Sequence, residues 1–158
     1  MPALGALLHA CVLAGASVNF VLPFTIGEAE AFWRDRIVGP ARQGGRIVLA
    51  ARAGGRIVGT VTLAVDTPPN QPHRAEVTKL LVHPQARRRG IARALMAALE
   101  EEARRRGRTL VTLDTRTGDA AEPLYASLGY VTAGVIPDFC RATDCDRLDS
   151  TTIMYRRL

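Results

Sequence analysis

A turn rich in arginine and glycine carries the clearest chemical signal in this sequence. It follows the strand-forming run 77–82 and opens an amphipathic pattern that predicts a helix to about Arg106. The first N–H groups of a helix and the positive end of its dipole converge on one point, where a phosphate can bind. Gly90 lets the backbone approach an anion closely, and three arginines add positive charge. We therefore predict a phosphate or pyrophosphate site formed by Arg87, Arg88, Arg89, Gly90, Ile91, Ala92 and Arg93. The alternative is a solvated turn that caps an ordinary helix.

The composition is that of one globular domain spanning residues 1–158. Of the 158 residues, 47% are hydrophobic and 23% are charged, which is ordinary for a chain that buries a single core. The net charge of +6 comes almost wholly from arginine, because Lys79 is the only lysine. Arginines cluster between residues 87 and 108, which suits a polyanionic cofactor. Nucleic acid is the other interpretation, but aromatic residues make up 5% of the chain and no basic segment is interleaved with them. We expect no nucleic-acid partner.

Metal sites, disulfides and membrane segments are not predicted. The three cysteines make an odd count without a C-x-x-C pair, and the three histidines are scattered. A reducing, cytoplasmic location is the default for such a chain. The apolar start lacks the basic region of a signal peptide and is too short to cross a membrane. Its spacing predicts a helix with a buried stripe of Leu4, Leu7, Leu8, Cys11 and Val12.

Hydrophobic periodicity and turn residues predict the remaining elements. A capping box of Thr25 and Glu28 begins a second helix, which Gly39 and Pro40 kink or end. Within the predicted helix 91–106, Glu100 to Glu102 and Arg104 to Arg106 form pairs spaced by four residues, which predicts a solvated face. Strands are predicted over 47–52, 56–65, 75–82, 109–114, 130–139 and 151–157, with a tight hairpin at 53–55 and a polar loop at 140–149. A second capping box, Asp119-x-x-Glu122, predicts a short helix to Leu128.

Two motifs in this arrangement resemble those of the GCN5-related N-acetyltransferase (GNAT) superfamily. The string Arg87-x-x-Gly90-x-Ala92 is similar to the acetyl-CoA signature Q/R-x-x-G-x-G/A of that family. The string Tyr125-x-x-x-Gly129-Tyr130 is similar to its second motif, Y-x-x-x-G-F/Y. The resemblance implies an α/β (α+β) fold with a mixed, mostly antiparallel twisted sheet flanked by helices. The family's first edge strand has no counterpart here, because Met1 leads almost directly into a helix.

The resemblance implies an enzyme that transfers acetyl from acetyl-CoA to an amine by direct attack, without a metal. In the family the pantetheine arm of the cofactor pairs with the central strand, so the backbones of Leu80, Leu81 and Val82 are expected to hold it. A backbone N–H near Leu80 would polarise the thioester carbonyl. The Asn that often precedes the second motif is Gly118 here, so the side chain that usually makes one cofactor hydrogen bond is missing at this position. Homodimers are common in the family, so a dimer is a possible state.

Acetyl transfer needs a base for the acceptor ammonium and an acid for the departing thiolate. The resemblance assigns the acid to Tyr125, whose alternative role is an aromatic packed under its helix. Glu76 and Asp114 are the two candidate bases. The alternative for Glu76 is an ion pair at the strand edge, with Lys79 or an arginine, and the alternative for Asp114 is an Asx-turn acceptor.

Longer stretches resemble the tabtoxin-resistance branch of the superfamily, including Arg74 to Leu80 and Leu113-Asp114-Thr115. In that branch the aspartate and the helix tyrosine are the proposed base and acid, which favours Asp114 with Tyr125 and a small, amino-acid-like acceptor. A protein or peptide acceptor and a non-catalytic acyl-CoA sensor remain as alternatives. The family's early helices flank the acceptor, but Phe32 and Trp33 are predicted mainly as core residues. A covalent acetyl group on Cys140 is disfavoured because no basic partner for its thiol is identifiable.

Overall fold

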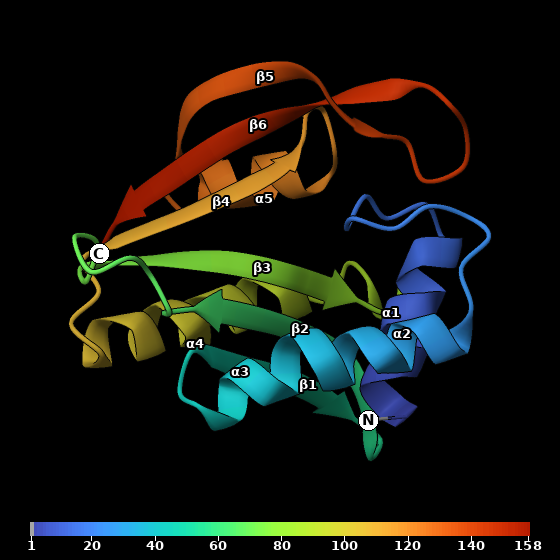
Figure 1. Ribbon diagram of the computed structural model, residues 1–158, viewed down its shortest axis with the longest axis horizontal. Helices are drawn as coiled ribbons and strands as arrows, with labels where there is room; N and C mark the ends of the chain where they lie inside the picture. The colour runs from blue at the N-terminus through green and yellow to red at the C-terminus, as the bar shows by residue number, and fades with distance from the viewer. Residues whose placement is uncertain (1) are drawn as a thin grey trace.

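The computed structural model describes residues 2–158, and its centre is a single six-stranded sheet (Figure 1). The strand order across the sheet is β1-β2-β3-β4-β6-β5. Only β3 and β4 run parallel, and the other neighbours are antiparallel, which confirms the predicted mixed sheet. The strands are β1 (Arg46–Ala53), β2 (Arg56–Ala64), β3 (Arg74–Val82), β4 (Leu110–Arg116), β5 (Val131–Arg141) and β6 (Leu148–Arg157).

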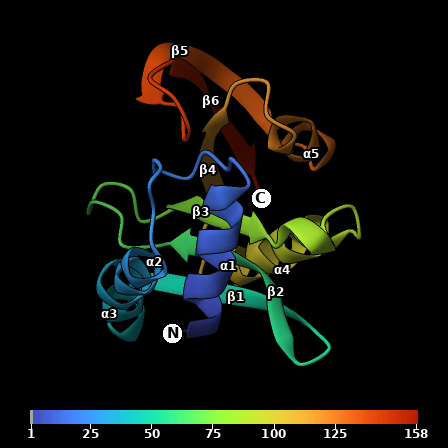
Figure 2. The ribbon, with the colours of Figure 1, turned by 90° about the vertical axis from the view of Figure 1, so that its right-hand side faces the viewer.

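Helices cover both faces of the β1–β3 half of the sheet, with α1 and α2 on one face and α4 on the other (Figure 2). Helix α5 packs beside β4, and no strand precedes β1 within residues 2–158, as the sequence led us to expect. None of these helices is long and apolar enough to cross a bilayer. The helical segments are α1 (Pro2–Leu13), α2 (Ile26–Phe32), a π-helix (Trp33–Val38), α3 (Gly39–Arg42), a 3₁₀ turn (Pro84–Ala86), α4 (Ile91–Arg105) and α5 (Ala121–Ser127).

Two apolar clusters hold these layers together. The larger cluster packs α4 and α5 against β2, β3, β4 and β6, and includes Leu63, Val77, Leu99, Leu113 and Met154. The second cluster packs α1 and α2 against the opposite face of β3 and includes the predicted α1 stripe. Trp33 is fully buried in this second cluster, which confirms its prediction as a core residue, whereas Phe32 is only partly buried at its margin.

Local signals in the sequence explain several element ends. The Thr25 hydroxyl accepts from the Glu28 N–H, and the Glu28 carboxylate accepts from the Thr25 N–H at 2.7 Å, so the first capping box forms as predicted. Gly54 and Gly55 both adopt positive φ, which is what a tight turn between antiparallel strands requires. These residues therefore fix where α2 begins and where β1 and β2 join.

Of the two outcomes predicted at Gly39 and Pro40, a kink or an end of the helix, the end does not occur: a π-helical stretch precedes Gly39, and the chain stays helical through Arg42. Two other local predictions are wrong. The capping box at Asp119 does not form: α5 begins after Ala120, and the Glu122 carboxylate accepts from the Gly118 N–H instead. Glu100 does not lie on the solvated face of α4. It is 4% exposed and pairs with Arg156 of β6 at 2.6 Å.

The hairpin of β5 and β6 is longer than predicted. Both strands extend into the predicted polar loop, so that only residues 142–147 connect them. The register shifts by two residues between Ile136 and Cys140, where Asp138 has a positive φ. Strand β5 forms one outer edge of the sheet, and almost all of its residues are exposed.

Candidate active site

A cleft of about 850 Å³ opens where the sheet splits between β3 and β4. The two parallel strands pair only over Arg74–Glu76 and Leu110–Thr112, and beyond that point they have no register partners in each other. The backbone of β3 from Val77 to Val82 therefore has no strand on its β4 side, and all of these residues line the cleft. An extended ligand can pair with a strand left open in this way.

A β-bulge in β3 distorts the backbone at the middle of the split. Thr62 of β2 faces Thr78 and Thr60 faces Leu81, so Lys79 and Leu80 have no register partners on β2. Lys79 adopts a φ of 53°, which is unusual for a residue with a side chain. Because a bulge takes backbone groups out of the ladder, the N–H groups near Leu80 can be directed at a ligand in the cleft.

The predicted phosphate turn lies at one end of this cleft. Gly90 is the N-cap of α4, its φ is 77°, and no side chain caps the first N–H groups of the helix. A Cβ added to Gly90 would meet no atom within 4 Å, so the space in front of the helix end is open. Arg87, Arg88, Gly90, Ile91, Ala92 and Arg93 line the cleft, whereas Arg89 does not. The free N–H groups, the helix dipole and the arginines fit the pyrophosphate of acetyl-CoA.

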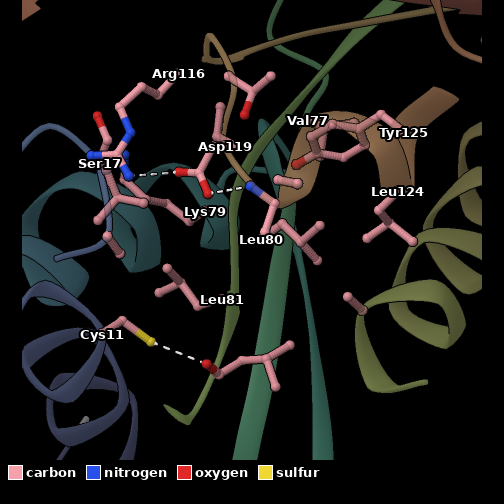
Figure 3. A pocket seen from close by; sticks show the side chains of 18 of the residues that line it. Cys11, Ser17, Val77, Lys79, Leu80, Leu81, Arg116, Asp119, Leu124 and Tyr125 are labelled. Carbon is pink, nitrogen blue, oxygen red and sulfur yellow. Dashed lines mark hydrogen bonds and ion pairs between the residues drawn. The ribbon is translucent and has the colours of Figure 1, made fainter. Parts of the chain in front are cut away.

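Tyr125 approaches the cleft from α5. Its ring is 6% exposed and packs against Tyr130 with the ring centroids 5.8 Å apart. Figure 3 shows its hydroxyl pointing inward toward β3, opposite Lys79, Ser17 and Arg116. Burial raises the pKa of Tyr125 above its usual value, and the negative charges of Asp114 and Asp119 raise it further. The hydroxyl therefore keeps its proton at neutral pH, as a donor to a departing thiolate must.

Asp114 lies on the facing strand, past the point where β3 and β4 separate. Side chains alternate along β4, so buried Leu113 faces α4 and Asp114 projects from the other face of the sheet. Asp114 is exposed, and its Oδ2 accepts from the Thr151 hydroxyl at 3.2 Å. It forms no ion pair within residues 2–158, so its charge is available to a cationic ligand.

Glu76 also lines the cleft, at the last residue pair before the strands separate. Its carboxylate lies 3.6 Å from Arg74, and the same guanidinium donates to the Thr112 hydroxyl at 3.0 Å. This arginine ion pair is the alternative that the sequence offered for Glu76. Asp114 has no such cationic partner among residues 2–158. Of the two candidate carboxylates, Asp114 is therefore the one that is free to meet a cationic ligand.

Lys79, the only lysine of the sequence, lines the cleft but was not predicted as a site residue. Its ammonium lies 5.4 Å from the ring centroid of Phe32 and 5.9 Å from that of Phe20. Burial lowers the pKa of Lys79, and the charge of Asp114 opposes that shift. A lysine within a strand pattern is usually a surface residue, so the pattern offers no reason to place Lys79 in a site. The bulge in β3, which the sequence pattern does not predict, brings it into the cleft.

Several other polar groups of the cleft have partners within the protein. The Arg116 guanidinium lies 3.2 Å from Asp119 and 3.7 Å from Asp149. The Cys11 thiol donates to the Val82 carbonyl at 3.5 Å, and burial raises the pKa of this thiol. Cys140 lies 3.9 Å from the Ser17 hydroxyl. Among residues 2–158 there is no group of three His, Cys, Asp or Glu side chains arranged to hold a metal ion.

Comparison with known proteins identifies the family. Residues 17–130, which include the phosphate turn, the split strands and Tyr125, match the model of the acetyltransferase (GNAT) family. This match covers most of the chain, and the chain therefore belongs to the GNAT family of acetyltransferases.

Individual relatives agree with this assignment. An uncharacterized N-acetyltransferase encoded in the hisH-hisA intergenic region of Azospirillum brasilense is 35% identical over 114 residues, which are 71% of this chain and 66% of that protein. The match thus spans slightly less than two thirds of that relative. The crystal structure of ribosomal-protein-alanine N-acetyltransferase from Brucella melitensis has a TM-score of 0.81 and 26% identity, over 99% of this chain and 93% of its own. The fold is also that of yncA from Salmonella typhimurium, solved with its cofactor acetyl-CoA, at a TM-score of 0.77 and 23% identity over 98% and 86% of the two chains.

Proposed function

We propose that this protein transfers the acetyl group of acetyl-CoA to the amine of a small, amino-acid-like molecule by direct attack in a ternary complex. The observation that carries the proposal is the split between β3 and β4, which has an open helix N-terminus at one end and brings Asp114 and Tyr125 to its two sides. Acetyl-CoA supplies an activated acyl group as its thioester. The chain supplies the binding groups, the base and the acid. We expect this chemistry to take place in the cytoplasm.

The phosphate turn and β3 hold the cofactor in this proposal. The N–H groups that begin α4, together with Arg87, Arg88 and Arg93, bind the pyrophosphate. The open backbone of Leu80, Leu81 and Val82 binds the pantetheine arm, as an added strand would. The bulge directs an N–H near Leu80 at the thioester carbonyl, where it stabilises the developing oxyanion.

Asp114 and Tyr125 move the protons. Asp114 takes a proton from the acceptor ammonium, and the amine then attacks the carbonyl carbon. The C–S bond breaks, the Tyr125 hydroxyl donates its proton to the departing sulfur, and the second proton lost by the attacking nitrogen returns the tyrosinate to its neutral form. Tyr125 packs in the core on the α4 face of the sheet, whereas Asp114 projects from the other face, so the base and the acid do not compete for one position.

The amino-acid-like acceptor is supported by the sequence resemblance to the tabtoxin-resistance branch, and a tabtoxin-type β-lactam amino acid is one member of that class. The Brucella relative favours a second candidate, the N-terminal amine of a protein. A homodimer is a further proposal, which light scattering would test. It is supported by exposed apolar side chains along edge strand β5, namely Val131, Val135, Ile136 and Phe139.

The test of the proposed function is thiol release from acetyl-CoA with a panel of amino acids, β-lactam amino-acid analogues, polyamines and short peptides. We expect release with the amino-acid class, and a fall of kcat by about 100-fold or more in Asp114→Asn. Glu76→Gln is the matched control, since it neutralises a carboxylate in the same cleft, and we expect it to lose less than tenfold. Release with peptides alone would support the protein acceptor. If no compound in the panel supports release although acetyl-CoA binds, the proposal is contradicted in favour of an acyl-CoA sensor.

A further inference from the structure

The positively charged side chains that line the cleft differ in whether they have an anionic partner. Arg116 is paired with two carboxylates, and Arg87, Arg88 and Arg93 lie around the start of α4, at the phosphate end. Lys79 lies at the bulge of β3, in the part of the cleft between β3 and β4 that we call the inner cleft, and forms no ion pair within residues 2–158. It is therefore the one cation of the inner cleft without an anionic partner among the described residues.

The carboxylates that line the cleft likewise differ in whether they have a cationic partner. Glu76 is paired with Arg74, and Asp119 is paired with Arg116. Asp114 accepts a hydrogen bond from Thr151 but has no cationic partner within 4.0 Å. Lys79 and Asp114 both line this cleft, yet they do not form an ion pair with each other. The inner cleft thus holds one positive and one negative group with a gap between them.

We propose that Lys79 binds a carboxylate of the acceptor, so that Lys79 and Asp114 together select a free amino acid. This inference rests on the proposed function, because it assigns the substrate class of the same site. In an α-amino acid the ammonium and the carboxylate are attached to one carbon, so one molecule can present its ammonium to Asp114 and its carboxylate to Lys79. Each charge of the protein then gains a partner of opposite sign in a partly buried site.

The surroundings of Lys79 favour this use. Phe20 and Phe32 do not line the cleft, and their rings hold the ammonium by cation–π attraction without supplying an anion that would neutralise it. An acceptor carboxylate would also oppose the effect of burial by favouring the charged form of Lys79. An amine without a carboxylate gains nothing from Lys79, and a polyamine is repelled by it. The N-terminus of a protein carries an amide in place of the carboxylate, so Lys79 discriminates against it as well.

The single lysine allows a direct binding test. Biosynthetic [¹³C]lysine labelling gives one lysine side-chain signal, that of Lys79, in the wild-type protein. We would titrate the CoA-loaded protein with pairs that differ by one carboxylate, such as phenylalanine against phenethylamine and lysine against cadaverine. We expect saturable shifts of the Lys79 ε signals with at least one amino acid and none with its amine partner. Absence of any shift with the twenty proteinogenic amino acids, or equal shifts with both members of a pair, would overturn the inference.

Kinetics with variants provide a second readout. For an accepted amino acid, Lys79→Met should lower kcat/KM by about 10- to 100-fold, which is the usual effect of losing a charged hydrogen bond. Lys79→Arg should restore part of it. The affinity for CoA should be unchanged, and kcat/KM for the matched amine should not fall. Arg52→Gln, which removes a positive charge on β1 outside the cleft, is the control.

The two proposals fail in different ways. Turnover that falls equally for amino acid and amine in Lys79→Met would overturn the role of Lys79 and leave the acetyltransferase function in place. Absence of turnover with every acceptor would contradict the proposed function, while the titration of wild-type Lys79 would still decide whether the cleft binds carboxylates. Because that titration uses the unmodified protein, it does not depend on whether a variant folds.

Discussion

Replacing Tyr125 by Phe tests the proposed acid most directly, because the change removes one oxygen and leaves the buried ring in place. The ring is 6% exposed and keeps its contact with Tyr130, so the core loses no apolar volume. The hydroxyl forms no hydrogen bond within residues 2–158, so no partner is left unsatisfied. We therefore expect the free energy of unfolding to change by less than about 1 kcal/mol.

The effect on turnover should be large by comparison. General acid catalysis contributes about 100- to 10,000-fold, so kcat of Tyr125→Phe should fall by at least about 100-fold while CoA affinity stays near wild type. The assay is steady-state thiol release with an identified acceptor, accompanied by urea unfolding and CoA titration.

Tyr130→Phe is the matched control. Tyr130 is 4% exposed and adjacent in the same core, but it does not line the cleft. Its kcat should stay within about threefold of wild type. Equal kcat for Tyr125→Phe and wild type would refute the assignment of the acid, and an equal loss in both variants would show that the effect comes from packing.

Three further predictions follow from the site and the core. Gly90→Glu places bulk and negative charge in front of α4 and should weaken CoA binding more than tenfold by calorimetry, whereas Gly54→Glu, in a distant turn with positive φ, should not alter it. Arg156→Met leaves the buried Glu100 carboxylate without its partner, so the free energy of unfolding measured in urea should fall by about 2–4 kcal/mol. Glu100→Gln should lower it less, because the charge that remains is on the more exposed partner, Arg156; a larger loss for Glu100→Gln than for Arg156→Met would contradict this account. Burial raises the pKa of Tyr125 and Tyr130, so above pH 10 the unfolded chain loses protons that the folded chain keeps. The free energy of unfolding should therefore fall by up to about 1.4 kcal/mol per pH unit for each tyrosine. A free energy of unfolding that is constant from about pH 9 to 11 would disprove this prediction.

Local chemistry in the sequence was sufficient to predict much of the fold. Glycines with positive φ mark the hairpin at Gly54 and the start of α4 at Gly90, and the Thr25 capping box marks α2. These signals act over a few residues, so they can be interpreted without the tertiary structure. The phosphate turn belongs to this class, and the structure brings most of its predicted residues to the cleft.

Features that depend on contacts distant in sequence could not be predicted in this way. Glu100 resembles its neighbours Glu101 and Glu102, and only the position of β6 shows that it meets Arg156 in the core. At Asp119 the capping motif is present, but the turn after β4 directs its carboxylate to Arg116 instead. The bulge that brings Lys79 into the cleft depends on the register between β2 and β3, which the sequence of β3 alone does not encode.

The split also gives the sheet more edges than its six strands would suggest. Besides the outer edges at β1 and β5, the open side of β3 and the facing side of β4 are inner edges with unpaired backbone groups. An open strand edge is normally a template for aggregation. Here the inner edge of β3 is recessed within the cleft, which residues of α1 and α5 also line, and these helices limit the approach of a strand from another protein. The same recess that offers β3 to a narrow, extended ligand therefore protects it from pairing with other proteins.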